Sequence, residues 1–327
     1  MKVKHLPEDF VVEEVIDLDI KENGNYAYFL LTKKNYNTLK AIELIATKLK
    51  VPIKNIGFAG TKDRQAITTQ YCSLYKGRRE QLEKISLDGI KVEFVGYGDE
   101  QLYLGRHKGN HFIITIRDLD EKEADQFEQC SFSRMINYFG EQRFSNNNAK
   151  IGKAIVKKDF KQAIELIFQN HGEQEQKVKE YLKKNPTDYI GALRVLPFKL
   201  LKLFVGAYQS KLWNVVAEEF SAYDKNLELP IIGFGTAFED SNVKKAYEAL
   251  LRKEKITLRD FVIPQIPDLS SEGNKRQLFI DVVDFSVSEA ILDECFSGKK
   301  KIVVQFTLPS GSYATSLINQ LPSACLI

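Results

Sequence analysis

The sequence lacks the features that define several large classes of protein. No segment approaches the run of about 18 apolar residues that a membrane-spanning helix needs, and the first ten residues, MKVKHLPEDF, lack the apolar core of a signal peptide. Cysteine is scarce and forms no CxxC pair that would suggest a zinc or redox site. The four cysteines are Cys72, Cys130, Cys295 and Cys325. We therefore expect a cytoplasmic protein with no membrane association, whose cysteines are small buried or neutral side chains.

Histidine and net charge are also low. His107 and His111 have i,i+4 spacing, but HKGNHFIITI predicts a loop that enters a strand, where this spacing does not bring two imidazoles together. We expect no metal. The net charge of +3 neither requires nor excludes nucleic acid. The local basic clusters KGRRE (76–80), GRHKGN (105–110) and SGKKK (297–301) are solvated turns, unless the fold brings them together as a phosphate-binding groove.

The remaining composition is that of an ordinary globular protein. The chain has 327 residues, with 43% hydrophobic and 28% charged residues, which fits two domains or one domain with an insertion. Runs of β-branched and aromatic residues predict strands over 9–18, 26–32, 66–75, 90–98 and 111–119. Two helices are also expected, the first over 37–50 and the second over 123–140. We therefore expect an α+β fold.

The first of these helices has a clear pattern. Its apolar residues follow a 3-4-3 spacing, and Asn37 or Thr38 is the expected N-cap. The expected apolar face is Leu39, Ile42, Ala46 and Leu49.

The pattern changes twice along the chain. It is mostly helical from about residue 145, and strand patterns return over 277–289 and 300–309. We expect residues 1–144 and 277–327 to form one domain with a mixed or antiparallel sheet, which the chain's tail rejoins. Residues 145–276 are then a largely helical insertion domain.

One segment, IGFAGTKDRQAITTQ (56–70), combines two glycines with an acid between two cations. Gly57 and Gly60 allow a sharp turn or a close approach to a ligand. Lys62 and Arg64 favour the ionised form of Asp63 if either side chain folds toward it, and an ionised carboxylate can act as nucleophile or general base. The alternative is an exposed charged turn. A Walker A loop is excluded, because the glycines are too close and Asp63 stands where Ser or Thr is required. The TKD of GTPases is excluded because no phosphate loop accompanies it.

Three further motifs carry candidate binding residues. In GNHF, Asn110 is a turn amide and Phe112 an aromatic that can stack on a base, or both are structural. YFGEQRF contains Arg143, and AYQSKLWN places Lys211 beside the only tryptophan on a predicted helix. Either of these two motifs contacts RNA by stacking and hydrogen bonding, or is a packed helix between domains.

Taken together, these segments resemble the pseudouridine synthase D (TruD) family, which modifies tRNA. Six matching pieces occur in the family's order along almost the whole chain: KHLPEDFVVEE, IGFAGTKDRQAITTQ, GNHFIITIR, YFGEQRF, AYQSKLWN and LPSGSYATSLINQL. The resemblance implies a pseudouridine synthase catalytic domain with a family-specific insertion domain. It also implies isomerisation of uridine to pseudouridine in tRNA, with position 13 as the family's usual target and no cofactor.

The resemblance also implies roles for individual residues. Asp63 falls on the catalytic aspartate, as nucleophile at C1′ or base at C2′. Phe112 falls on the aromatic that stacks on the target base, Asn110 on an active-site amide, and Lys4 on a basic residue that can pair with Asp63. Lys62 and Arg64 are expected to support the charge of Asp63.

The expected partner is tRNA, bound by basic residues of the cluster GRHKGN and of the motifs YFGEQRF and AYQSKLWN. These residues are Arg106, Lys108, Arg143 and Lys211. No dimerisation element is evident, so we expect a monomer. The alternative function, of a different class, is a catalytically silent RNA-binding or RNA-folding protein on the same scaffold.

Overall fold

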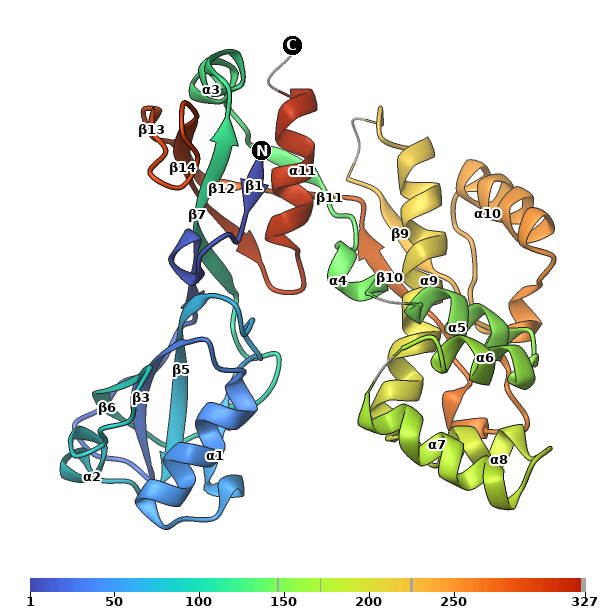
Figure 1. Cartoon of the computed structure of the whole chain (residues 1–327), viewed down its shortest axis with the longest axis horizontal. Helices are drawn as coiled ribbons and strands as arrows, with labels where there is room; N and C mark the ends of the chain where they lie inside the picture. Colours follow the sequence, from blue (N-terminus) through green and yellow to red (C-terminus); the bar gives the residue numbers. More distant parts are fainter. Residues whose placement is uncertain (146, 171, 224–225, 325–327) are drawn as a thin grey trace. The chain divides into compact units, whose positions relative to one another are not determined.

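The computed structural model describes residues 1–145, 147–170, 172–223 and 226–324, and it divides the chain into two compact units (Figure 1). Unit 1 comprises Met1–Met135 and Asp281–Ile327, and unit 2 comprises Ile136–Ile280. The domain boundaries expected from the sequence, after Phe144 and before Gln277, both lie inside unit 2.

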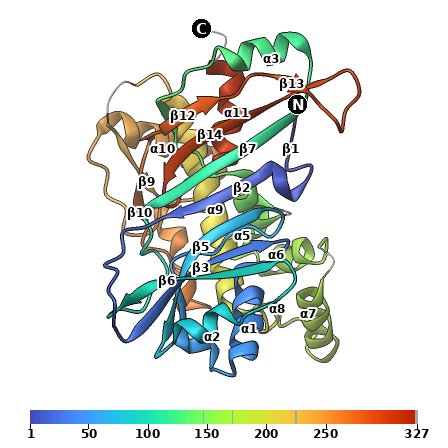
Figure 2. The same ribbon diagram turned by 90° about the vertical axis from the view of Figure 1, so that its left-hand side faces the viewer.

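Unit 1 is built on a 10-stranded mixed sheet. Its main path runs β12-β14-β7-β2-β5-β3-β6, as Figure 2 shows, with β1 beside β7, β13 beside β14 and β4 beside β5. The strands are β1 (Lys2–Val3), β2 (Phe10–Val15), β3 (Tyr26–Lys34), β4 (Ile56–Phe58), β5 (Ile67–Tyr75), β6 (Ile90–Gly98), β7 (Gly109–Leu119), β12 (Val283–Val287), β13 (Ile291–Leu292) and β14 (Lys300–Pro309). Strands β2 and β5 are parallel, and the other pairs are antiparallel. Because β14 pairs with β7 along most of its length, the prediction that the tail rejoins the first sheet is confirmed.

The helices of unit 1 lie around this sheet. They are α1 (Thr38–Leu49), α2 (Arg79–Glu83), α3 (Glu121–Glu128) and α11 (Ala314–Ala324), with the 3-10 turns η1 (Pro7–Asp9) and η2 (Ile53–Asn55). Asn37 caps α1 by accepting a hydrogen bond from Lys40 N (2.7 Å), as predicted. The predicted apolar face was wrong at Leu39, which is exposed, because the helix buries Ala41, Ile42 and Ile45 against the sheet.

The helix predicted over 123–140 was wrong beyond residue 128. Helix α3 ends at Glu128, and β8 (Arg134–Ile136) follows and pairs with β11 (Phe279–Asp281). The partner strand is far away in the sequence, so local spacing could not reveal it.

The prediction for the cysteines needs one correction. Cys72 is buried and free, and Cys295 is exposed and free, whereas Cys130 is disulfide-bonded. Isolated positions in a sequence do not show which cysteines the fold brings together. Cys325 lies outside the described residues.

Unit 2 is the largely helical part of the chain. Its helices are α4 (Glu141–Phe144), α5 (Asn148–Val156), α6 (Phe160–Ile167), α7 (Glu173–Lys184), α8 (Tyr189–Arg194), α9 (Phe198–Glu219) and α10 (Ser241–Glu254), with the 3-10 turns η3 (Leu258–Phe261) and η4 (Pro267–Leu269) and the strand pair β9 (Glu228–Ile231) and β10 (Asn274–Gln277). The 22-residue helix α9 is buried on most sides, which is typical of the central helix of a core. The predicted helical texture is thus confirmed.

A search for membrane spans is negative in the part of the chain that the structure describes. No helix there has both the length and the apolar character needed to cross a bilayer.

Candidate active site

Asp63 lies in the connection 59–66, which joins the paired strands β4 and β5. A Cβ atom on Gly57 would lie 2.2 Å from Leu102 O, and one on Gly60 would lie 3.0 Å from the His107 ring. Gly57 therefore allows another part of the chain to approach β4 closely, and Gly60 does the same for the connection.

The sheet presents two rows of side chains on the face that α1 covers. Because side chains alternate between faces along a strand, residues paired across the strands share a face. The first row is Phe306, Phe112, Val12, Thr68 and Lys33, on β14, β7, β2, β5 and β3. The second row contains Leu308, Asn110 and Glu14 on β14, β7 and β2, and the pair Gln70 and Leu31 on β5 and β3. Most of the predicted site residues of unit 1 thus belong to one face or to the connection 59–66.

Buried polar groups hold the connection against this face. Lys62 N donates to Thr38 Oγ1 (2.9 Å), Thr38 Oγ1 donates to Gln70 Oε1 (2.9 Å), and Gln70 Nε2 donates to Gly60 O (2.9 Å). The Lys62 side chain forms a buried ion pair with Glu14 (Nζ to Oε1, 2.6 Å). Lys62 was expected to support the charge of Asp63, but its ammonium group points to Glu14. The connection between residues 60 and 62 is therefore fixed by groups from β2, β5 and α1.

Lys33 is a further residue that holds the connection, and the sequence analysis missed it. Its side chain is fully buried, and its ammonium group donates to the carbonyl oxygens of Asp63 (2.8 Å) and Tyr36 (2.7 Å). Burial lowers the pKa of Lys33 to about 8, although the charge of Asp63 opposes this shift. The signal was available in the sequence: strand alternation places Lys33 on the same face as Phe29 and Leu31.

The cation that pairs with the Asp63 carboxylate is Lys4. The Lys4 Nζ atom lies 2.6 Å from Asp63 Oδ2 and 3.9 Å from the centre of the Phe10 ring. An adjacent cation favours the ionised carboxylate. The Asp63 side chain is 36% exposed, so it remains accessible to solvent. Lys4 has a φ of 58°, a left-handed conformation that non-glycine residues adopt at a cost, commonly at functional sites.

The PEDF motif places Lys4. Asp9 accepts a hydrogen bond from Leu6 N (2.8 Å), which closes the turn after Lys4. The Asp9 carboxylate is in turn bound by Arg117 on β7 (Nε to Oδ1, 3.0 Å), and Arg117 also binds Asp293 (2.8 Å). All three side chains are buried. This ionic cluster fixes the segment that carries Lys4 to the sheet.

Asn110 and Phe112 lie two residues apart on β7. Phe112 is only 7% exposed and packs against Phe10 and Phe306, with ring centroids 6.1 and 5.4 Å apart. The structure provides no hydrogen bond to two buried oxygens on this face among the described residues, Asn110 Oδ1 and Thr68 Oγ1. Buried polar atoms usually have a partner, and exceptions are often found where a ligand binds.

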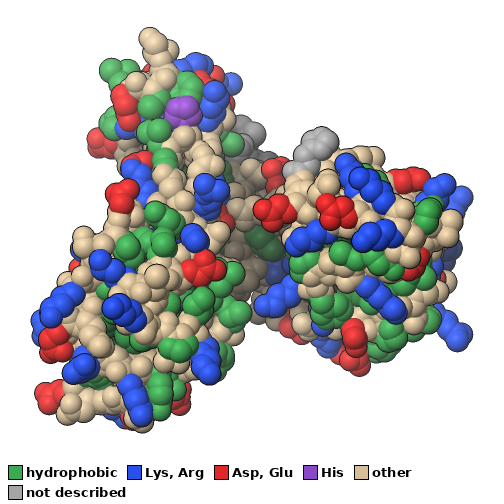
Figure 3. All heavy atoms as spheres, turned by 60° about the horizontal axis from the view of Figure 1, so that its bottom comes forward, with side chains coloured by type: hydrophobic (Ala, Val, Ile, Leu, Met, Phe, Trp, Pro, Cys, Tyr) green, Lys and Arg blue, Asp and Glu red, His purple; other side chains and the backbone are tan. Residues whose placement is uncertain are grey.

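The other basic residues of unit 1 that were predicted for the site lie at the surface of the unit. Arg64 and Lys108 are exposed, Arg106 is half-buried, and Lys108 forms an ion pair with Asp17. The clusters at 105–110 and 297–301 lie at opposite ends of the β7–β14 pair, which are roughly 33 Å apart at 3.3 Å per residue. These two clusters therefore do not converge. On the face drawn in Figure 3, Lys and Arg side chains are dispersed among Asp and Glu side chains.

Unit 2 contains the other two motifs, which pack against each other. The Asn214 side chain bonds both the N–H and the C=O of Phe139 (2.9 Å each), and the Phe139 ring meets Trp213 edge-on. Trp213 is fully buried, so this part of the AYQSKLWN motif is a packed helix rather than a stacking surface. Arg143 bonds Ser210 (3.3 Å), and Lys211 is exposed on α9.

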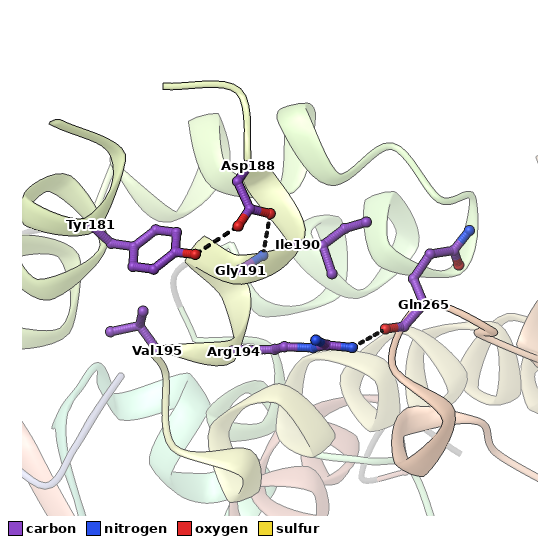
Figure 4. A pocket seen from close by; sticks show the side chains of 7 residues that line it. All are labelled: Tyr181, Asp188, Ile190, Gly191, Arg194, Val195 and Gln265. Carbon is purple, nitrogen blue, oxygen red and sulfur yellow. Dashed lines mark hydrogen bonds between the residues drawn. The ribbon is translucent and has the colours of Figure 1, made fainter. Parts of the chain in front are cut away.

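Unit 2 also has an open depression of about 590 Å³, shown in Figure 4. Three of its polar side chains have structural partners: Tyr181 donates to Asp188 (2.6 Å), Asp188 caps α8 at Gly191 N (2.8 Å), and Arg194 binds the backbone oxygen of Gln265 (2.7 Å). We therefore assign no chemistry to it.

The side chains of the site that can take part in a reaction are thus the Asp63 carboxylate and the Lys4 ammonium group. Within the described ranges, no three His, Cys, Asp or Glu side chains are grouped as a metal site would require. His107 and His111 do not form a pair: His107 contacts Ala59 and Ser310, and His111 contacts Thr307. An ionised carboxylate beside a cation can act as nucleophile or base.

Comparison with known proteins adds three findings. The family model of tRNA pseudouridine synthase D (TruD) matches residues 1–181, 167–228 and 216–321. The chain is 30% identical to a "Probable tRNA pseudouridine synthase D 2" of Methanocaldococcus jannaschii (98% of this chain, 91% of the relative) and 29% identical to the tRNA pseudouridine synthase D of Aquifex aeolicus (98% of each). The crystal structure of the "Putative tRNA pseudouridine synthase D (TruD)" from Methanosarcina mazei superposes with a TM-score of 0.79 at 25% identity, covering 100% of this chain and 93% of that one.

Proposed function

The chain belongs to the tRNA pseudouridine synthase D family of isomerases, and we propose that it converts the uridine at tRNA position 13 to pseudouridine, with Asp63 as the reacting side chain. In this isomerisation the bond between N1 and C1′ breaks, the uracil turns, and C5 bonds to C1′. The proton that C5 loses is balanced by the proton that N1 gains, so no other reactant is consumed.

One observation carries the assignment of Asp63. Its carboxylate is paired with Lys4 (2.6 Å) and remains partly exposed, while its own carbonyl oxygen is held by the buried Lys33 (2.8 Å). The ion pair favours the ionised carboxylate, and the anchored backbone fixes its position, as a reacting group requires. Nucleophilic attack at C1′ and proton abstraction at C2′ both start from this state.

The neighbouring residues suit the binding of a flipped uridine. Extrusion of a base from its stack costs a few kcal/mol, and stacking on an aromatic ring offsets part of this cost. We assign the stacking role to Phe112, whose ring is supported by Phe10 and Phe306, and hydrogen bonding to the uracil to Asn110. Arg106, Lys108, Arg143 and Lys211 are assigned to the tRNA backbone.

The test compares wild type with Asp63→Asn on an unmodified tRNA transcript that contains U13. We expect the variant to bind the transcript but to lose activity by a factor on the order of 10³ or more. The matched control is Asp99→Asn, because Asp99 is also paired with a lysine (Lys21, 2.8 Å) but is exposed. Pseudouridine is mapped by carbodiimide labelling and primer extension. RNA binding without pseudouridine from wild type, on tRNA and on total cellular RNA, would assign the silent binder instead.

A deuterium label at C2′ of the target uridine separates the two roles of Asp63. Proton abstraction at C2′ breaks the bond to deuterium, so it predicts a slower single-turnover rate. Attack at C1′ leaves that bond intact and predicts an unchanged rate.

A further inference from the structure

The turn before β7 presents two large apolar side chains to solvent. Tyr103 is 62% exposed and Leu104 is 63% exposed, and they are adjacent in the chain. We propose that this turn, residues 102–106, is an RNA-binding element in which Tyr103 stacks on a base next to the target uridine. This inference rests on the proposed function and adds an aromatic contact outside the motifs that the sequence analysis singled out.

The turn is held firmly at its base. Leu102 is buried, and its N–H donates to Ser73 Oγ on β5 (2.9 Å). Arg106 N donates to Tyr103 O (3.1 Å), which closes the turn, and Gly105 adopts a φ of +94° that a side chain would strain. The two apolar side chains thus project from an anchored turn. Such a rigid aromatic surface loses little conformational freedom when a base stacks on it.

The same turn is bonded to the connection that carries Asp63. Gly105 N donates to Ala59 O (2.8 Å), and His107 Nδ1 lies 3.1 Å from the same oxygen. The Ala59 carbonyl can only accept, so His107 Nδ1 carries the proton and Nε2 accepts from the Ser310 hydroxyl (3.0 Å). Ala59 precedes Asp63 by four residues, so their Cα atoms lie within about 14 Å of each other. The exposed tip is therefore anchored, through Ala59, to the connection that carries the reacting carboxylate.

Charge identifies RNA as the occupant of this surface. Arg106 and Lys108 follow the tip directly, and Lys108 is exposed. The ion pair of Lys108 with Asp17 joins two exposed side chains, and such surface pairs are weak and easily exchanged for a phosphate. An exposed aromatic followed by cations is a combination that binds unstacked nucleic acid, with bases on the ring and phosphates on the cations.

The experiment measures binding of the U13 transcript to full-length Asp63→Asn protein, so that the RNA is not converted, with and without Tyr103→Ala. We expect Tyr103→Ala to weaken binding roughly tenfold, the range found when a stacking aromatic is truncated, and Tyr103→Phe to restore it. The control is Leu292→Ala, because Leu292 is also a highly exposed apolar residue of unit 1 but lies at the other end of the β7–β14 pair. We expect Leu292→Ala to bind like the parent protein.

Salt dependence gives a second readout that stacking alone does not change. Tyr103→Ala leaves the slope of log Kd against log salt unchanged, because no phosphate contact is lost, whereas Lys108→Ala reduces it by about one. Unchanged binding of Tyr103→Ala, the same loss in Leu292→Ala, or a reduced salt slope in Tyr103→Ala would each overturn the inference. The proposed function is decided separately, by pseudouridine formation in the protein with Asp63 intact.

Discussion

In unit 1 the buried side chains include six charged residues, whereas the buried polar side chains of unit 2 are uncharged in the part of the chain that the structure describes. The buried charged residues are Asp9, Glu14, Lys33, Lys62, Arg117 and Asp293. The buried polar residues of unit 2 are Asn137, Asn148, Gln209 and Ser210. Burial of a charge costs free energy unless the charge is paired. Unit 1 therefore needs a partner for each of its buried charges, and unit 2 does not.

The buried charges of unit 1 lie where they position the candidate site. Lys33, Lys62 and Glu14 hold the connection that carries Asp63. Arg117, Asp9 and Asp293 hold the turn that carries Lys4. Unit 2 instead positions its motifs by apolar packing around α9 and by hydrogen bonds such as those of Asn214 to Phe139. Unit 1 thus buries charged groups, at a cost in stability, to fix two oppositely charged side chains, Lys4 and Asp63, whereas unit 2 does not.

The largest expected effect comes from removing one partner of a buried pair in unit 1. Lys62→Met leaves Glu14 buried without its cation, which we expect to destabilise the protein by about 3–5 kcal/mol. The matched control is Lys91→Met, because Lys91 pairs with Glu93 on the surface (2.9 Å), and exposed pairs contribute little. Urea unfolding followed by circular dichroism measures both variants. Equal urea midpoints for the two variants would show that the buried ion pair contributes no more to stability than the exposed pair.

In unit 2 we expect the free energy of unfolding to depend on the volume of buried side chains rather than on their charge. A Cβ atom on Gly152 of α5 would lie 1.9 Å from Phe204 O of α9, so Gly152→Ala must separate the two helices, at a cost of roughly 3 kcal/mol. Fluorescence of Trp213, the only tryptophan, reports the unfolding of this unit.

Gly206→Ala is the control for this substitution. Its Cβ would meet the end of the Arg143 side chain (2.5 Å), which can move, and alanine favours the helix. We expect this variant to be at least as stable as wild type. A stable Gly152→Ala would show that the helices can separate without penalty.

The last expected effect is a pH dependence that Lys33 gives to unit 1, and it is absent at neutral pH. Burial lowers the pKa of Lys33 to about 8 in the folded protein, whereas an unfolded lysine has a pKa of about 10.4. Below about pH 8 both states hold the proton. Between the two values the unfolded state binds more protons, so stability rises with pH through this window. Lys33→Met removes the titrating group, and urea unfolding at several pH values should show a smaller rise. Parallel pH profiles for wild type and variant would contradict the assignment.

Much of the fold could be predicted from local sequence. The alternation of apolar residues marks β2, β3 and β5, and Asn37 marks the start of α1, because these signals depend on residues only two to four positions apart. The prediction failed after Glu128, where the chain forms β8 instead of continuing a helix. It failed there because the strand's partner, β11, comes from a distant part of the chain.

For the candidate site, the motif around Asp63 is visible in the local sequence, including the glycines and the flanking cations. Which cation pairs with which acid depends instead on the folded chain: Lys4 pairs with Asp63, and Lys62, next to Asp63 in the sequence, pairs with Glu14. The physical reason is that an ion pair depends on distance in space. The partners lie 59 and 48 residues apart in the chain, and strand pairing and burial, which bring them within 2.6 Å, have no local signature.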